Sequence, residues 1–302
     1  MGAKIEMVSV SRPWFGFTNG NSINMTVRAA SRCLHEAKID PCSIGLIINT
    51  GLYRFKNIGE PAIAALVQKR IGANTTREKF SCNSRSTFSF DLNNGGCGWL
   101  TGIQIIQECM NTNEISYGMV VTGDSEPFNG LSEGFNFRSA AAAIILSRSI
   151  DSRGFALFRS YSFPDHCDEL TSSTSYNQTK GKGINKNILC VRQKESYPEI
   201  CVDCATESLY NFLDETGLTI KDIDLIVTSQ SPAGFTSGMK TRVGMNGNLI
   251  EVPGMKNKEF HTAGPAYALK RAWDANRFES SKNIIFLTVG SGINVSVALY
   301  VN

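Results

Sequence analysis

The feature that most constrains the fold of this chain is an internal repeat. Residues 23–51 and 200–230 each combine a helical pattern, a short polar turn and an apolar strand that ends in small polar residues. Later apolar segments recur in the same order, 115–125 with 282–292 and 140–149 with 293–302. Between its strands, each half also has a glycine-containing turn followed by a helical pattern. Two halves with the same order of elements predict an internal duplication.

Apolar strands that alternate with helices predict an α/β fold with mainly parallel sheets covered by helices. Two such units placed back to back predict a layered α/β/α/β/α architecture, with one half over residues 1–155 and the other over 156–302. Active sites in such folds gather where loops leave the carboxyl ends of strands. We therefore expect the two equivalent turns, around Cys97 and around His261, to lie near each other at the seam between the halves.

The composition excludes several classes of protein. The net charge of +3 and the lack of a long basic run give no reason to expect a nucleic-acid partner. The longest fully apolar run, residues 140–146, is too short to span a membrane, and the N-terminus lacks the pattern of a signal peptide. Nine cysteines without framework spacing predict reduced thiols in a cytoplasmic protein.

Cys201 and Cys204 form a CxxC pair, which in principle could bind zinc or act as a redox site. No second CxxC and no histidine pair follows, and the surrounding residues have the pattern of an amphipathic helix. The sequence therefore favours a structural helix face here and no metal site.

The stretch DLNNGGCGWLTGIQI (residues 91–105) places Cys97 between glycines at the start of an apolar helical pattern. A thiolate is the reactive form of cysteine, and the N-terminus of a helix stabilises it. Gly96 and Gly98 would let the backbone turn sharply and approach a bound thioester closely. The alternative is that Cys97 is a small buried side chain in a catalytically inactive protein.

Three stretches together resemble the ketoacyl synthase III type of the thiolase superfamily. They are FDLNNGGCGWL (90–100), EPAIAALVQKRIGAN (60–74) and VGSGINVSVALYV (289–301), and the resemblance extends over nearly the whole chain. It implies a thiolase-like fold, a homodimer, and transfer or condensation of acyl groups carried as thioesters of coenzyme A or acyl carrier protein. It implies no metal, no redox cofactor and no permanently bound group.

The residues that carry the family's chemistry are altered. Aligned without a gap from Phe90 to Gly98, the family's cysteine falls on Gly96, and Cys97 stands one residue later. Ser229 stands where the family has its histidine, and His261 stands where it has its asparagine. The usual Cys-His-Asn set is therefore absent from its usual positions.

We predict catalytic roles on this basis. Cys97 is the expected nucleophile and His261 the expected base and then acid, because the other two histidines, His35 and His166, lie in a surface-like helix and a polar stretch. Ser229 is a weaker candidate that cannot carry positive charge.

Other residues are predicted to bind the substrate. Backbone N–H groups at Cys97 and near Gly290 are expected to form an oxyanion hole, and Gln230 is a possible enolate donor. Phe128, with Phe135 and Phe137, is expected to line an acyl tunnel, although plain packing is an alternative for all three. The basic segment 180–187 could contact an acidic carrier protein or a phosphopantetheine phosphate, or could be a solvated loop.

The predicted function is thioester-dependent acyl transfer or condensation through acyl-Cys97, in fatty-acid-like, polyketide or other secondary-metabolite biosynthesis. Loss of the family's histidine shifts the expectation towards transacylation, because a simple transfer needs only the cysteine and one base. The alternatives are an inactive partner subunit that pairs with an active homologue in a heterodimer, and a thioester hydrolase that uses Cys97 and His261.

Overall fold

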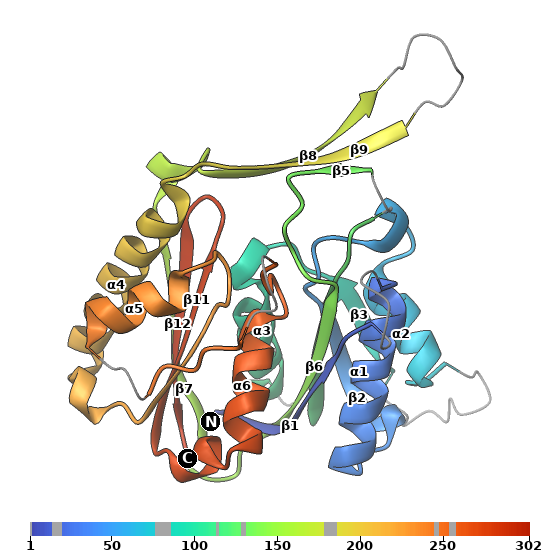
Figure 1. Cartoon of the computed structure of the whole chain (residues 1–302). Coiled ribbons are helices and arrows are strands. Elements are labelled where there is room, and N and C mark those ends of the chain that lie inside the picture. Colours follow the sequence, from blue (N-terminus) through green and yellow to red (C-terminus); the bar gives the residue numbers. More distant parts are fainter. Residues whose placement is uncertain are drawn as a thin grey trace.

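Two β-sheets form the frame of the molecule (Figure 1). The computed structural model describes residues 2–13, 20–75, 86–112, 115–127, 131–177, 186–244, 248–253 and 258–302. The first half contains β1 (Ala3–Ser11), α1 (Ser22–Ala37), β2 (Ile44–Asn49), α2 (Ile63–Ile71), β3 (Phe88–Asp91), α3 (Gly98–Asn111), β4 (Tyr117–Asp124) and β6 (Ala140–Arg148). The second half contains β7 (Gly154–Ser162), α4 (Tyr197–Thr216), β10 (Leu225–Thr228), α5 (Phe235–Val243), α6 (Gly264–Asp274), α7 (Arg277–Ser280), β11 (Asn283–Gly290) and β12 (Asn294–Val301).

The two sheets repeat one strand order. The first runs β1-β6-β4-β2-β3, and in the second β7, β12, β11 and β10 take the places of β1, β6, β4 and β2. β7 begins at Gly154, so the predicted boundary between residues 155 and 156 falls just inside the first strand of the second sheet. The α/β fold class predicted from the repeat is confirmed.

The sheets are mixed, whereas the sequence predicted mainly parallel ones. β2 pairs in parallel with β3 and β4, and β10 with β11, but β6 and β12 run antiparallel to both of their neighbours. For β12 the reason is the length of the connection. Only residues 291–293 join β11 to β12, and so short a link cannot carry the chain back to the start of a parallel strand.

Helices fill the layers between and outside the sheets (Figure 1). α3 and α6 lie in the centre, α1 and α2 cover the outer face of the first sheet, and α4 and α5 cover the outer face of the second. The apolar side chains Leu100, Ile103 and Ile106 of α3 are buried in the central core with Trp99 and Phe286. α3 packs closely against β4, since a Cβ on Gly118 of β4 would overlap with the Ile106 side chain of α3.

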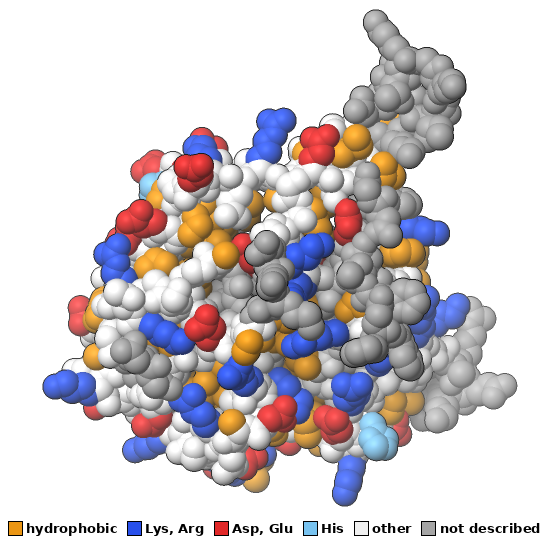
Figure 2. Space-filling view, viewed as in Figure 1, with side chains coloured by type: hydrophobic (Ala, Val, Ile, Leu, Met, Phe, Trp, Pro, Cys, Tyr) orange, Lys and Arg blue, Asp and Glu red, His pale blue; other side chains and the backbone are white. Residues whose placement is uncertain are grey.

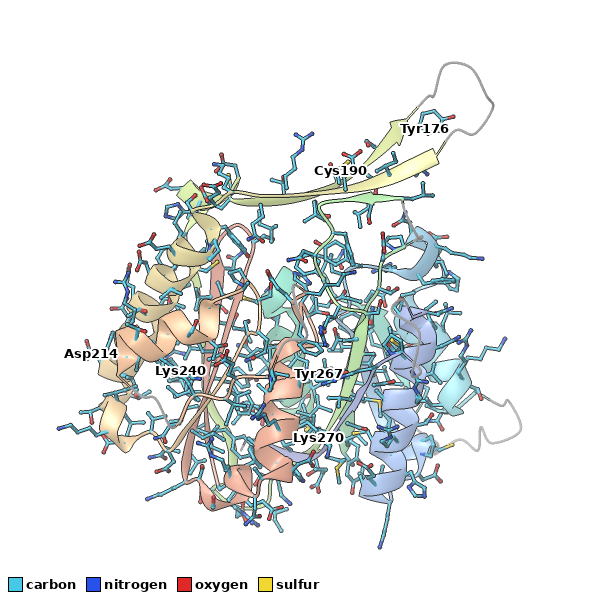
Figure 3. All side chains as sticks on the ribbon, viewed as in Figure 1. Tyr176, Cys190, Asp214, Lys240, Tyr267 and Lys270 are labelled. Carbon is cyan, nitrogen blue, oxygen red and sulfur yellow. The ribbon has the colours of Figure 1, made fainter. Side chains whose placement is uncertain are left out.

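A third, smaller sheet lies across the top of the molecule (Figure 1). It is made of β5 (Ser132–Glu133), β9 (Lys186–Gln193) and β8 (Leu170–Asn177), and Figure 3 labels Tyr176 and Cys190 on its long hairpin. Most of the basic segment 180–187 falls outside the described residues, and its last two residues begin β9. Short 3₁₀ helices complete the fold: η1 (Pro41–Ser43), η2 (Phe55–Asn57), η4 (Gly95–Cys97), η5 (Pro164–His166) and η6 (Ile220–Asp222).

The prediction of a structural helix face for the CxxC pair agrees with the structure. Cys201 and Cys204 lie on the buried face of α4, as the helical pattern predicted. In the part of the chain that the structure describes, no cluster of histidine, cysteine and carboxylate side chains could hold a metal ion. Within the same residues, every helix is too short or too polar to cross a membrane.

The contact between α3 and β4 can be tested with Gly118→Ala. The added Cβ meets the stiff side chain of Ile106, so we expect the free energy of unfolding to fall by about 1–3 kcal/mol. Gly59→Ala is the control, because a Cβ there meets nothing within 4 Å. Urea denaturation of both variants measures the difference, and equal stability would contradict the close packing described.

Candidate active site

Cys97 lies where the sequence predicted, at the end of η4 and the start of α3. Its side chain, however, is fully buried and points at the other half of the molecule. The thiol donates to the carbonyl oxygens of Asn294 at 3.2 Å and Thr288 at 3.5 Å. Burial raises the pKa of the Cys97 thiol to about 11, although the hydroxyls of Thr288 and Ser296 act in the opposite direction. The thiol is therefore protonated at neutral pH.

Gly96, the position aligned with the family's cysteine, has no room for a side chain. A Cβ built on Gly96 would overlap with the carbonyl oxygen of Val289 at the end of β11. Gly290 lies just as close, since its own Cβ would come within 3.0 Å of the Gly96 nitrogen. The Cys97 N–H, one of the predicted oxyanion donors, donates to the Asn94 carbonyl at 3.0 Å within η4. The backbone of the second half thus lies directly against Gly96 and leaves no room for a side chain there.

Ser229 and Gln230 are both held by the backbone. The Ser229 hydroxyl accepts from the Val289 N–H at 3.0 Å, so it braces the segment that closes on Gly96. The Gln230 side chain donates to Thr228 and Ile250 carbonyls at 3.0 and 3.1 Å and accepts from the Val252 N–H at 2.8 Å. The Gln230 amide is therefore engaged at both its nitrogen and its oxygen, and the Ser229 oxygen is engaged by the Val289 N–H.

His261 lies in a separate aromatic cluster. Its ring centroid is 4.5 Å from that of Phe137 and 5.2 Å from that of Tyr53, and the residue is 8% exposed. Nδ1 is buried without a hydrogen-bond partner, 3.5 Å from an oxygen of Asp124. Nε2 is the ring nitrogen that remains for a ligand.

Asp124, at the end of β4, is the residue that the sequence analysis missed. One carboxylate oxygen accepts from the N–H groups of Leu52 and Tyr53 at 2.9 and 2.8 Å, and the other accepts from the Thr262 N–H at 3.0 Å. Burial acts to raise the pKa of Asp124, but His261 and these donors outweigh it and hold the pKa below its usual value. An acid directly after a buried strand, in VVTGDS, was the available signal.

The predicted tunnel residues Phe135 and Phe137 both belong to this cluster. Tyr53 stacks on Phe137 at 5.1 Å and meets Phe135 edge-on at 5.2 Å. A cavity of about 330 Å³ lies beside Tyr53, between the 52–59 segment and the hairpin residues Ser172–Thr174 and Leu189. Phe128, the third predicted tunnel residue, lies outside the described residues.

The predicted site residues therefore form two groups at the same end of the sheets. Cys97, Gly96, Gly98, Gly290 and Ser229 gather around the end of β11, and His261 gathers with Asp124, Tyr53 and Phe137. Across the described residues, no hydrogen bond or ion pair joins Cys97 to His261. Of the other two histidines, His35 is exposed on α1 and His166 is half-buried in η5.

Comparison with known proteins gives a consistent result at low sequence identity. No family model matches the chain. The β-ketoacyl-[acyl-carrier-protein] synthase III of Clostridium novyi is 22% identical over 290 residues, which cover 92% of this chain and 84% of that protein. The acyl-CoA:acyl-CoA alkyltransferase of Xanthomonas campestris is 22% identical over 285 residues, or 90% of this chain and 79% of that protein.

Solved structures match over the full length. The 3-oxoacyl-[acyl-carrier-protein] synthase III of Aquifex aeolicus has a TM-score of 0.79 at 17% identity, with 100% of both chains covered. OleA of Xanthomonas campestris, solved with lauric acid and lauroyl-CoA, has a TM-score of 0.80 at 17% identity and covers 100% of this chain and 99% of that one. The chain is therefore a distant relative of the β-ketoacyl synthase III proteins and shares the thiolase-like fold of the solved synthase structures.

Proposed function

We propose that this chain is an acyl-thioester-binding subunit of the ketoacyl synthase III type that does not carry the acyl group on a cysteine. The observation that supports this most is the closed turn. The aligned position is Gly96, without space for a side chain, and the neighbouring thiol is buried, protonated and bonded to carbonyl oxygens. The chain would then act beside an active homologue, which supplies the nucleophile.

We place the second subunit against β3, the edge strand of the first sheet. Phe88 on this strand is 65% exposed, which is unusual for a large aromatic side chain. The acyl donor would be a thioester of coenzyme A or of acyl carrier protein, in fatty-acid-like or secondary-metabolite biosynthesis. The cavity beside Tyr53 and the Phe135–Phe137 pair would hold its acyl chain. The eight described cysteines are all free thiols, in keeping with a cytoplasmic protein.

A second candidate is acyl transfer through Cys97 itself, and the His261–Asp124 pair favours it. A purely structural subunit has little need of an imidazole held against a buried carboxylate. In this reaction the Cys97 sulfur bonds to the thioester carbonyl carbon, the carbon–sulfur bond to the donor breaks, and the donor leaves as a thiol. His261 would take the proton from Cys97 and return it to the leaving thiolate, which requires the turn to open first.

Intact-protein mass spectrometry with a panel of acyl-CoA and acyl-carrier thioesters separates the two candidates. We expect no stable adduct on the chain alone, because the thioester carbonyl cannot reach Cys97. An adduct that disappears in Cys97→Ala and slows in His261→Ala would overturn the non-acylating proposal and establish the transferase. A homologous synthase that acylates only in the presence of this chain would support the partner role.

Thiol labelling gives an independent test of the closed turn. With iodoacetamide at pH 8 we expect the exposed Cys167 to react readily, while Cys97 stays unmodified until the protein is unfolded in urea. Peptide mapping after timed labelling measures both rates. Comparable rates at Cys97 and Cys167 in the folded protein would show that the turn opens.

The buried carboxylate makes stability depend on pH. A lowered pKa in the folded state adds stability that is present above the unfolded pKa of about 3.9 and is lost as pH falls through the folded value. We expect Asp124→Asn to cost about 2–3 kcal/mol near pH 7, and the gap to the native protein to shrink below about pH 4. Urea titrations across pH measure it. Asp214→Asn, which changes an exposed carboxylate on α4 (Figure 3), is the control and should show no such gap.

A further inference from the structure

Two arginines converge on one pair of aromatic rings, and a third lies beside them. Phe260 and Tyr267 stack with centroids 4.4 Å apart. The Arg12 guanidinium lies 5.4 Å from the Phe260 centroid and 5.2 Å from that of Tyr267, and the Arg138 guanidinium lies 5.3 Å from Phe260. Arg28 joins them from α1, donating to the Ser11 hydroxyl at 2.7 Å and to the Arg12 carbonyl at 2.6 Å. Figure 2 shows Lys and Arg side chains gathered over α6 and β1 on this face, and Figure 3 labels Tyr267 at its centre.

Arg12 and Arg138 bring two positive charges to the same ring, that of Phe260. Neither Arg12 nor Arg138 forms an ion pair with a described carboxylate. Burial and the charge of Arg12 lower the pKa of Arg138, which is the effect of like charges held close together. Burial raises the pKa of Tyr267 to about 12, while the charges of the three arginines act to lower it. The Tyr267 hydroxyl donates to the Ser11 carbonyl at 2.9 Å.

The cluster is separated from the candidate active site by two short extended segments. Phe137 forms a parallel β-bridge with Glu259, and the Arg138 N–H donates to the Glu259 carbonyl at 2.7 Å. Residues 136–138 and 259–261 therefore lie side by side. Side chains alternate along extended backbone. Phe137 and His261 accordingly contact each other on one face, and Arg138 and Phe260 contact each other on the opposite face. The arginine cluster is thus a second site behind the wall of the first.

We propose that Arg12 and Arg138 bind a phosphate-bearing small molecule at this second site. Guanidinium groups match phosphate oxygens with paired, charge-assisted hydrogen bonds, and several of them together suit a group of more than one negative charge. Arg12 is exposed and Arg138 is half-buried, so the ligand meets two guanidinium groups and not a broad basic face of the kind that binds nucleic acid. A bound phosphate removes the repulsion between the guanidiniums and braces the wall that carries His261.

The test measures binding of inorganic phosphate, pyrophosphate, coenzyme A and phosphate-free pantetheine at matched ionic strength, by calorimetry and by the thermal unfolding midpoint. We expect pyrophosphate to bind and to raise the midpoint, and Arg12→Gln and Arg138→Gln each to weaken binding about tenfold. Arg32→Gln is the matched control: it removes an exposed charge on α1 whose guanidinium donates to the Val10 carbonyl, away from the aromatic pair. If Arg138→Gln does not fold, Arg12→Gln alone tests the proposal, because Arg12 is exposed and its replacement should leave the fold intact.

The arms also distinguish the source of the phosphate and the place of binding. Coenzyme A that binds with the same arginine dependence, while pantetheine does not, would support the proposal and identify a nucleotide thiol as the ligand. Unchanged pyrophosphate binding in His261→Ala would support a site behind the wall. Failure of every phosphate compound to bind the native protein, equal binding by Arg12→Gln and the native protein, or loss of binding in His261→Ala would overturn it. These results do not depend on whether Cys97 is acylated.

Discussion

The end of the molecule that carries the site depends on the buried carboxylate of Asp124. It is the last residue of β4 in the first half, and it accepts hydrogen bonds from the 52–53 segment and from Thr262 of the second half. Removing a carboxylate from water is costly, and the donors around it are what make an ionised side chain tolerable there. Because those donors come from separate segments, one side chain fixes the position of Tyr53, the turn before α6 and the ring of His261 relative to β4.

The same seam explains why the cysteine is closed off. On the side away from Asp124 the two halves meet backbone to backbone, with Gly96 against Val289 and Gly290. So close an approach is possible only where side chains are absent. Ser229 reinforces it, because its hydroxyl accepts a hydrogen bond from the Val289 N–H. Gly96 and Ser229 thus act together: one has no side chain to hold the halves apart, and the other bonds the segment that lies against it.

The sequence carried the large-scale organisation and little of the site geometry. The repeat, the strands and the buried face of α3 were predictable, because hydrophobic periodicity reports which side of an element faces a core. The antiparallel course of β6 and β12 was not predictable in this way. The prediction of parallel sheets was based on the alternation of helices and strands and took no account of the lengths of the connecting segments. The direction of the Cys97 side chain could not be predicted from the sequence either, because the conformation of a single 3₁₀ turn determines whether the thiol points outward or towards β11. Asp124 was missed because its role depends on donors 71 and 138 residues away along the chain.

The alternation of side chains at the wall between the two groups has a consequence for how they communicate. His261 and Phe137 are fixed on one face by Asp124 and Tyr53, so Phe260 and Arg138 are fixed on the other face by the same backbone. A rotation of either segment that moved His261 towards the Cys97 turn would pull Phe260 out of its stack with Tyr267 and separate the guanidiniums that lie over it. An anion held by those guanidiniums opposes that rotation. An anion bound at the arginine cluster would therefore reduce the mobility of His261. By the same coupling, a ligand that requires the His261 ring to move would weaken anion binding at the arginines.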